Sequence, residues 1–228
     1  MSVAIVTGAS RGLGLALTRS LSTHGWTIVV DGRDGHALVD AADDLGESVI
    51  AVPGDVSDSE HRRALLKAAE EQGGLDLLVN NASALGPSPQ PKLGDYPIDI
   101  LRKVYEVNVL AALALTQLCL PRLMRAGGVV INITSDAGVE GYEGWGGYGS
   151  SKAALEQISN VLAVEHPELS VYWVDPGDMN TRMHQEAFPD EDISDRPPPE
   201  ESVPGLMRLI NQRPASGRYR VADLKESV

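Results

Sequence analysis

Three side chains in the middle of the chain could carry out acid–base chemistry together. Tyr148 and Lys152 lie four residues apart, and Ser135 precedes Tyr148 by thirteen residues. Residues at i and i+4 are neighbours on one helix face, so the ammonium would lie beside the phenol. An ammonium favours the phenolate and lowers the phenol pKa from its usual value of about 10. Such a tyrosine can give a proton to an oxygen, or take one from it, near neutral pH.

A second chemical signal lies near the start of the chain, where glycines follow an apolar run. Val3–Val6 predicts a buried strand, Leu13–Leu21 has helical spacing, and the segment that joins them is Thr7-Gly8-Ala9-Ser10-Arg11-Gly12-Leu13-Gly14. A strand, a glycine turn and a helix N-terminus favour a bound phosphate, because free backbone N–H groups and the helix dipole both attract an anion. The spacing differs from the Gly-x-Gly-x-x-Gly fingerprint but meets the same needs. Taken alone, such glycines are often only structural.

The end of the second predicted strand bears on which dinucleotide would bind. Asp31-Gly32-Arg33 lies roughly 20 residues after the glycines, where ribose recognition is expected. An acid there binds the 2′-hydroxyl of NAD, whereas an arginine accepts the 2′-phosphate of NADP. Arg33 and Arg11 could bind one phosphate through bidentate hydrogen bonds. We therefore expect a preference for NADP(H), with NAD(H) possible; solvated loop charges would explain the same residues.

Apolar runs alternate with helical patterns along the whole chain. The expected strands are Val3–Val6, Thr27–Val30, Val49–Val52, Leu75–Val79, Val129–Ile133, Val171–Val174 and Tyr219–Val221. The expected helices are Leu13–Thr23, His36–Asp44, Glu60–Gln72, Ile98–Arg125, Tyr148–Val164 and Ser202–Asn211. This alternation predicts an α/β fold with a parallel sheet covered by helices. Ser57 and Glu60 have the spacing of a capping box, and Pro167 should end the helix that contains Tyr148.

Composition limits the cellular compartment and the partners. The chain has 228 residues, 43% of them hydrophobic, which suffices for one large domain. A net charge of −13 argues against nucleic acid or an anionic membrane as a partner. We expect no apolar run long enough to cross a bilayer and no room for a signal peptide, hence a cytoplasmic protein. Cys119 is the only cysteine and the histidines lack metal-ligand spacing, so we expect no disulfide and no metal site.

Several short motifs, in their joint order and spacing, resemble those of the short-chain dehydrogenases/reductases. They are TGASRGLG (7–14), GDVSD (54–58), NNAS (80–83), Asn108 in YEVNV, ITS (133–135), YGSSK (148–152) and DPGDMNT (175–181). The resemblance runs from Thr7 to about Thr181. It implies one Rossmann-type, doubly wound domain over residues 1–228, with about seven parallel strands. It also implies a homodimer or homotetramer joined through the two long helices, Ile98–Arg125 and Tyr148–Val164.

The resemblance implies roles for residues along a bound cofactor. Asp55 would hydrogen-bond the adenine amine, with Val56 beside it. The full set expected to contact the cofactor is Gly8, Ser10, Arg11, Gly12, Leu13, Gly14, Arg33, Asp55, Val56, Asn80, Ala82, Tyr148, Lys152, Pro176, Gly177 and Thr181. Many of these residues would also be explained as ordinary turn or strand-end residues. Ser83 departs from the glycine that is usual in the family's NNAG motif.

The resemblance makes Asn108, Ser135, Tyr148 and Lys152 one catalytic unit. Ser135 would orient the substrate oxygen, and Tyr148 would donate or remove the proton. Lys152 would lower the phenol pKa and hold the ribose hydroxyls, while the backbone carbonyl of Asn108 would hold a water that links Lys152 to solvent. Singly, each residue has a plain explanation, such as a solvated helix face or a turn cap. Together, behind a phosphate site, they favour catalysis.

Substrate contacts should come from loops around the nicotinamide. We expect Ser135, Tyr142, Trp145, Tyr148 and Asp178 to bind the substrate, a small neutral or cationic carbonyl compound or the matching alcohol. Glu140, Glu143 and Asp178 would disfavour an anionic substrate. Residues 178–200 could form a reduced lid over an open pocket, and His184 is more readily explained as a surface histidine.

Three other functions stay open at the level of the sequence. A 3-oxoacyl-carrier reductase is the main rival, although a carrier would favour a basic docking patch. A non-catalytic NADP-binding redox sensor would not need a proton donor. An epimerase or dehydratase on nucleotide sugars would usually carry a larger C-terminal region.

Overall fold

The protein is described by a computed structural model that places residues 2–224. Its centre is one seven-stranded sheet with the order β3-β2-β1-β4-β5-β6-β7, in which all neighbouring strands are parallel. The strands are β1 (Val3–Val6), β2 (Thr27–Gly32), β3 (Val49–Pro53), β4 (Leu77–Asn80), β5 (Val129–Ile133), β6 (Ser170–Asp175) and β7 (Gly217–Arg220). The predicted Rossmann-type α/β fold is confirmed.

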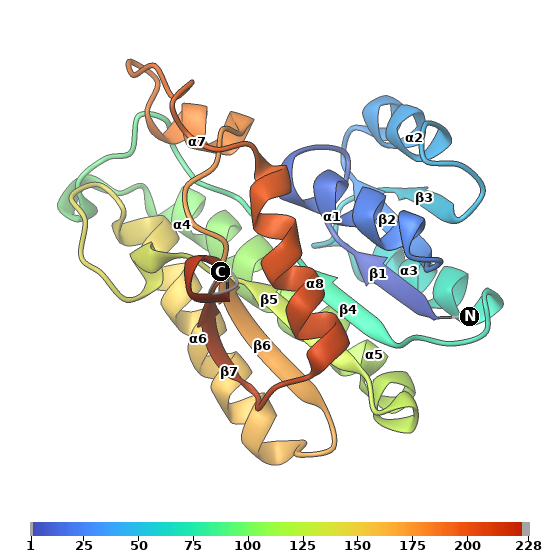
Figure 1. Ribbon diagram of the computed structural model, residues 1–228. Coiled ribbons are helices and arrows are strands. Elements are labelled where there is room, and N and C mark those ends of the chain that lie inside the picture. The colour runs from blue at the N-terminus through green and yellow to red at the C-terminus, as the bar shows by residue number, and fades with distance from the viewer. Residues whose placement is uncertain (1, 225–228) are drawn as a thin grey trace.

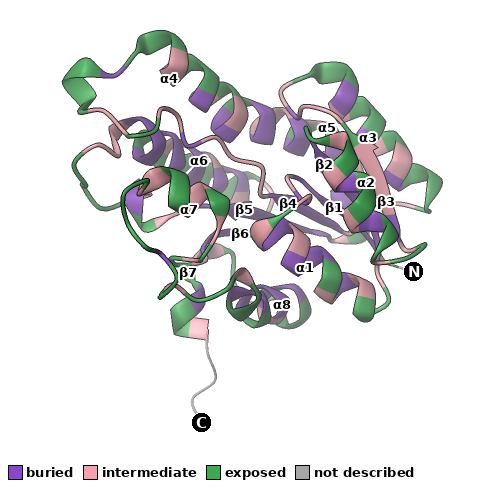
Figure 2. Ribbon diagram, turned by 90° about the horizontal axis from the view of Figure 1, so that it is seen from above, coloured by how far each residue is buried: buried purple, intermediate pink, exposed green. Residues whose placement is uncertain are grey.

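Helices cover both faces of this sheet (Figure 1). They are α1 (Gly12–Thr23), α2 (Gly35–Asp43), α3 (Ser59–Glu71), α4 (Ile98–Tyr105), α5 (Ala112–Ala126), α6 (Gly146–Glu165), α7 (Arg182–Ala187) and α8 (Val203–Gln212). Figure 2 shows α1 and α8 on one side of the strands and α3, α5 and α6 on the other. One apolar core therefore lies under α1, α2 and α8, and a second under α3, α5 and α6. Burial on both sides explains why the central strands are apolar throughout.

The longest helical stretch contains a local π turn. The segment η2 (Glu106–Ala111) joins α4 to α5 and carries Asn108. By length and composition the stretch Ile98–Ala126 could cross a membrane, because it has 29 residues and contains an 18-residue window with a mean hydropathy of 1.5. Our expectation that no apolar run reaches this length is therefore wrong. Leu115, Cys119 and Leu123 are nevertheless fully buried in the core, so this stretch packs as a core helix of the domain.

Some element boundaries differ from prediction because local contacts decide them. The capping-box prediction is wrong: Asp58 is the N-cap of α3 and accepts a hydrogen bond from the Glu60 backbone at 2.8 Å. Ser57 instead donates to Asp55. The prediction for Pro167 is confirmed, since α6 ends at Glu165 and His166 leaves helical geometry.

The last strand also differs from prediction. It covers Gly217–Arg220 rather than Tyr219–Val221, because its register is set by pairing with β6, from Tyr172 opposite Gly217 to Asp175 opposite Arg220. Helix α7 was not predicted at all, since it is short and has no buried residue.

The topology brings several loops to one edge of the sheet. All seven strands are parallel, so the segments that follow β1, β2, β3, β4, β5 and β6 emerge together. Strand order reverses between β1 and β4, and open α/β sheets bind ligands beside such a switch point. The segments that carry the expected site residues therefore share one edge.

Candidate active site

The glycine loop after β1 is fastened to the end of β4 by two side chains. Asn81 Nδ2 donates to the carbonyls of Thr7 at 2.8 Å and Gly8 at 3.1 Å. Thr7 Oγ1 accepts from the backbone N–H groups of Asn81 and Ala82, both at 3.0 Å. These four hydrogen bonds hold the loop in one position across the switch point. Asn81 lies within the NNAS motif, but the motif did not predict that its side chain would fasten the glycine loop to β4.

Two glycines in this loop cannot carry a side chain. Gly8 has a φ of +67°, which favours glycine, and a Cβ there would lie 2.9 Å from the Ala82 Cα. A Cβ at Gly14 would lie 2.6 Å from Asn81 Nδ2. Helix α1 therefore starts directly against the end of β4. Its first turn contains no acidic side chain, and its N-terminal N–H groups favour an anion.

Asp31, at the end of β2, is turned into the protein and away from solvent. It is 2% exposed. Oδ1 accepts from the Gly8 backbone N–H at 2.6 Å, and Oδ2 lies 3.2 Å from His61 Nε2. Of the two charges expected to bear on cofactor choice at the end of β2, the Asp31 carboxylate thus has a protein partner at each oxygen. Arg33 and Arg11 remain at the surface, where Arg11 lies 4.0 Å from Asp34.

Asp55 and Val56, the two residues expected beside the adenine, lie in the turn between β3 and α3. Asp55 Oδ1 accepts from the backbone N–H of Ser57 at 2.9 Å and from its hydroxyl at 2.7 Å, as in an Asx turn. Burial alone would raise the pKa of Asp55, but these hydrogen bonds and the charges of Arg33 and His61 lower it below its ordinary value. Val56 is buried in the core beside this turn.

The side chain of Asn80 lies in the interior rather than along the cofactor groove. Its Nδ2 donates to Thr116 Oγ1 at 3.0 Å and to Asn132 Oδ1 at 2.7 Å, and the residue is 5% exposed. The expectation that Asn80 lines the cofactor is thus corrected for its side chain. The physical reason is that a buried amide needs polar partners, which β5 and α5 supply. Only the Asn80 backbone is left to line the cofactor.

The loop after β6 approaches the glycine loop from the opposite side. The Gly177 backbone donates to Asp175 Oδ1 at 3.0 Å, and Pro176 O accepts from Ser202 at 2.9 Å. Thr181 caps α7 through the His184 backbone, and its methyl would lie 3.6 Å from a Cβ at Gly12. Of the expected residues Pro176, Gly177 and Thr181, Thr181 thus lies next to Gly12 of the glycine loop, and the other two lie in the segment between β6 and Thr181.

Asn108 is the hub of a buried polar cluster. It is 1% exposed and accepts from the backbone of Ala84 at 2.7 Å and from Ser83 Oγ at 3.2 Å. Its Nδ2 donates to Ala84 O and to Ser151 Oγ, both at 2.9 Å. Ser151 Oγ in turn donates to the Tyr148 carbonyl at 2.6 Å. The cluster joins the loop after β4 to the first turns of α6.

Lys152 and Tyr148 are both buried, and the Lys152 ammonium is hydrogen-bonded to a backbone carbonyl. Lys152 Nζ donates to the Ile133 carbonyl at 2.8 Å and lies 5.4 Å from the centre of the Tyr148 ring. Burial lowers the pKa of Lys152 from 10.5 to about 8. Burial raises the pKa of Tyr148, the Ser83 hydroxyl lowers it, and Asp175 and Asp136 raise it. The expected lowering of the phenol pKa by Lys152 is therefore wrong for this arrangement, in which the phenol is protonated.

Ser135 is held by side chains that the sequence did not indicate. Its hydroxyl donates to Asp136 Oδ1 at 2.9 Å and accepts from the Ala137 backbone at 3.2 Å. Its carbonyl accepts from Arg218 Nη2 at 3.3 Å. Arg218, on β7, also binds the buried Glu156 of α6 at 3.0 and 3.2 Å. The short turn that starts at Ser135 packs on α6, where a Cβ at Gly149 would overlap the Ala137 carbonyl.

Aromatic side chains continue the site outward from Tyr148. The Trp145 ring meets the Tyr148 ring edge-on, with centroids 5.7 Å apart. Phe188 packs on Trp145 at 5.8 Å, and His184 lies 5.0 Å from Phe188. The predicted lid region is thus folded in part as α7 and rests on Trp145. His184 is largely covered, which differs from the surface position that the sequence suggested.

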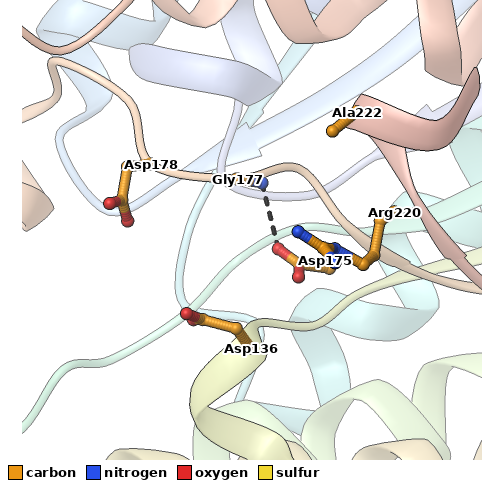
Figure 3. A pocket seen from close by; sticks show the side chains of 6 residues that line it. All are labelled: Asp136, Asp175, Gly177, Asp178, Arg220 and Ala222. Atoms are coloured by element: carbon orange, nitrogen blue, oxygen red, sulfur yellow. Dashed lines mark hydrogen bonds between the residues drawn. The ribbon is translucent and has the colours of Figure 1, made fainter. Parts of the chain in front are cut away.

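A cavity of about 180 Å³ opens at the ends of β6 and β7, next to Asp136 in the turn after β5 (Figure 3). Its lining consists of Asp136, Asp175, Gly177, Asp178, Arg220 and Ala222. Tyr142, expected to bind substrate, is 47% exposed and donates to Asp136 Oδ2 at 3.0 Å. The cavity is therefore rich in carboxylates, with Arg220 lying beside Asp175.

Within residues 2–224, no group of three or more histidine, cysteine or acidic side chains is placed to hold a metal ion. Four contributors were missed by sequence reasoning: Asn81, His61, Ser151 and Arg218. Ser151 lies inside the quoted YGSSK motif, and its small polar side chain next to Lys152 was a usable signal. Arg218 and His61 had none, since their partners lie 62 and 30 residues away.

Comparison with known proteins gives concordant results. The family model described as short chain dehydrogenase matches residues 2–192. A rhamnolipid-biosynthesis 3-oxoacyl-[acyl-carrier-protein] reductase of Pseudomonas aeruginosa is 36% identical over 193 residues, covering 79% of this chain and 74% of that protein. An uncharacterized oxidoreductase of Saccharomyces cerevisiae is 32% identical over 184 residues, covering 79% and 72%. A short chain dehydrogenase from Shigella flexneri, solved in complex with NADP, superposes with a TM-score of 0.90 at 27% identity and covers 97% of each chain.

Proposed function

The chain belongs to the short-chain dehydrogenase family, and from that premise we propose that it is an NADP(H)-dependent reductase of small neutral or cationic carbonyl compounds. The observation that carries the proposal is the cluster of three buried residues, Tyr148, Lys152 and Asn108, with the half-buried Ser83. Lys152 Nζ is bonded to Ile133, two residues before Ser135, at the carboxyl edge of the sheet. A protonated phenol in this position is a proton donor to a carbonyl oxygen.

The residues present fit a dinucleotide phosphate. Glycine at positions 8 and 14 lets the loop pack directly against the end of β4, because a Cβ at either position would overlap protein atoms there. The first turn of α1 has no acidic side chain that would repel a pyrophosphate. With Asp31 buried, the groups left at the ribose end are Arg33 and Arg11, which suit a 2′-phosphate. This charge pattern supports NADP(H) over NAD(H), as do the NADP and NADPH complexes of two structural neighbours. When bound, NADPH supplies the hydride.

Tyr148 acts as general acid in this proposal. It gives its proton to the substrate oxygen, and the resulting phenolate gains a hydrogen bond from Ser83. Lys152 keeps a positive charge close to that phenolate and is itself held by Ile133. Ser135 donates its hydroxyl hydrogen to the same substrate oxygen by releasing Asp136. Asn108 fixes the geometry by holding the β4 loop against α6.

The substrate class follows from the surroundings of Ser135. Asp136, Glu140 and Asp178 all lie near the Tyr142 hydroxyl, and Asp136 and Asp178 line the cavity. Negative charge there disfavours an anionic substrate and favours a neutral or cationic one. The flat faces of Trp145 and Phe188 would cover an apolar part of the molecule.

A 3-oxoacyl-carrier reductase is the second candidate, because a relative with 36% identity is named for that activity. Against it stands the acidic rim of the site, since an acidic carrier would be repelled. A sensor without catalysis is less well supported, because binding alone has no use for a buried proton donor and its hydrogen-bonded supports.

The surface supports assembly through α5 and α6. Exposed apolar side chains lie on both helical stretches: Leu110 in η2 and Met124 in α5, and Val161 and Val164 in α6. Val164 is 77% exposed. We propose that these faces join protomers into a homodimer or homotetramer. We also propose that the enzyme works in the cytoplasm, as its composition suggests.

The proposal is tested by NADPH oxidation against aldehydes, ketones, diketones, quinones and 3-oxoacyl thioesters. Tyr148→Phe should lower turnover by at least 100-fold, as general-acid catalysis contributes on that order, while NADPH still binds. Tyr172→Phe is the matched control, because Tyr172 is also buried but donates to Pro214 at the far end of its strand. Turnover that survives in Tyr148→Phe would contradict the acid role. Thioesters as the only substrates would select the second candidate.

A further inference from the structure

A buried histidine lies among the strand ends that form the adenosine side of the site. His61 is 8% exposed and stands in the first turn of α3. Its Nε2 lies 3.2 Å from Asp31 Oδ2. A carboxylate only accepts hydrogen bonds, so His61 must donate through Nε2. None of the catalytic or substrate roles above uses this residue.

The ring of His61 has one possible position. Gly54, just after β3, leaves room for it, since a Cβ at Gly54 would overlap the imidazole. The Gly54 backbone donates to the Gly32 carbonyl at 3.1 Å, which keeps the ends of β3 and β2 together. The imidazole is therefore packed between these strand ends and pointed at Asp31.

Asp31 passes this constraint on to the glycine loop. Its second oxygen accepts from the Gly8 backbone at 2.6 Å. The glycine loop also packs closely against Gly32, the residue after Asp31, because a Cβ at Gly32 would lie 3.2 Å from both Cβ and Oγ of Ser10. The hydrogen bonds that Asp31 accepts from His61 and from Gly8 thus connect α3, β2 and the glycine loop.

The His61–Asp31 pair also determines which charged side chains would face the ribose of a bound cofactor. Without His61 the carboxylate would keep only its hydrogen bond from Gly8, and its unpartnered oxygen could turn toward the ribose end. There it would bind a ribose hydroxyl and repel a 2′-phosphate. Held inward, Asp31 leaves Arg33 and Arg11 as the exposed charges at this end, with Asp34 beside Arg11 at 4.0 Å. An acid at the end of β2 is therefore compatible with a phosphate-bearing cofactor.

We propose that His61 is the positioning residue for cofactor choice: its hydrogen bond holds Asp31 against Gly8 and away from the ribose, which preserves the preference for the 2′-phosphate. This inference rests on the proposed NADP(H) dependence. It predicts that specificity, and not only binding, depends on a side chain that does not touch the cofactor.

The test compares dissociation constants of NADPH and NADH for four proteins: wild type, His61→Leu, His61→Gln and the double variant His61→Leu/Asp31→Asn. His61→Leu should reduce the NADPH-over-NADH ratio by about tenfold or more, since specificity is a difference of two affinities. His61→Gln keeps a donor and should keep most of the ratio. The double variant also removes the negative charge of Asp31, so it should regain the wild-type ratio. His166→Leu, which removes a surface histidine paired with Glu168 at 3.3 Å, is the matched control.

The outcomes separate this inference from the proposed function. A wild-type preference for NADPH that His61→Leu leaves unchanged would overturn the inference alone. An equal loss of both affinities, without a change in their ratio, would mean a purely structural role and would also overturn it. Because the ratio is measured on folded protein, partial unfolding of a variant does not distort it. A wild type that binds NADPH and NADH equally would overturn the proposed cofactor, and the inference with it.

Discussion

Ser83 places a hydroxyl between Asn108 and Tyr148. It donates to Asn108 Oδ1 at 3.2 Å and lowers the pKa of the nearby Tyr148 phenol. The hydroxyl has one proton to give, so ionisation of Tyr148 would draw that proton from Asn108 to the phenolate. At this position, where the family's NNAG motif has glycine, the chain therefore has an added donor near Tyr148, the proposed general acid.

Replacing Ser83 with alanine should raise the pKa of Tyr148, because the bond that favours the phenolate is lost. In alcohol oxidation the tyrosine must be ionised, so the rising limb of the pH–rate profile should move to higher pH. The maximal rate of carbonyl reduction should fall by several-fold to tenfold, as expected for one lost hydrogen bond to a charged group. Ser150→Ala is the control, because Ser150 lies on the same helix as Tyr148, α6, but is exposed. A limb that stays in place would contradict the role of Ser83.

Lys152→Met should abolish turnover and yet stabilise the fold at pH 7. Burial lowers the pKa of Lys152 from 10.5 to about 8, so at neutral pH the buried ammonium opposes folding. Between these two pH values the unfolded state binds more protons than the folded one, and wild-type stability should rise with pH. The variant should gain about 1–3 kcal/mol at pH 7, after the loss of the hydrogen bond to Ile133 is counted.

Urea unfolding from pH 7 to 10.5 tests this prediction. The gap between Lys152→Met and wild type should close as the pH rises through this range, because the unfolded lysine also loses its charge there. Lys67→Met, an exposed lysine paired with Glu71, should show no such gap. A variant less stable than wild type at every pH would show that the ammonium contributes net stability.

Arg218→Met should damage both stability and catalysis. Arg218 neutralises Glu156, which is 9% exposed, and holds the Ser135 carbonyl. Removing one partner of a buried pair leaves an uncompensated charge, which costs about 3–5 kcal/mol, and somewhat less here because the arginine is partly exposed. Loss of the bond to Ser135 should lower kcat while the dissociation constant of NADPH changes little.

Two further variants separate the effects of Arg218→Met. Arg218 also lies 3.6 Å from Asp175, so Arg218→Met leaves two carboxylates without their cation. Adding Glu156→Gln removes one of these charges and should restore part of the stability without restoring kcat. Arg63→Met, at an exposed pair with Glu60, should cost less than about 1 kcal/mol. A kcat that returns together with stability in the double variant would show that Arg218 acts on the fold alone.

Much of the architecture follows from local pattern. The fully apolar runs Val3–Val6 and Val129–Ile133 are strands because only burial on both faces suits them. The Tyr148–Lys152 spacing places both side chains on one helix, and both are buried there. For the polar strand β7, the predicted start was two residues too late and the predicted end one residue too late, because its register depends on pairing with β6.

The sequence by itself determined the fold class, the order of the motifs and the segments that meet at the carboxyl edge of the sheet, because periodicity and glycine turns are local properties. Only the tertiary structure decided what each polar side chain there faces. Asp31 lies where an acid would bind a ribose, yet His61, 30 residues away, and the Gly8 backbone take both of its oxygens. Lys152 is four residues from Tyr148, yet it donates to Ile133. A buried polar group bonds to whichever partner the packing brings near, and that partner is set by contacts distant in the chain.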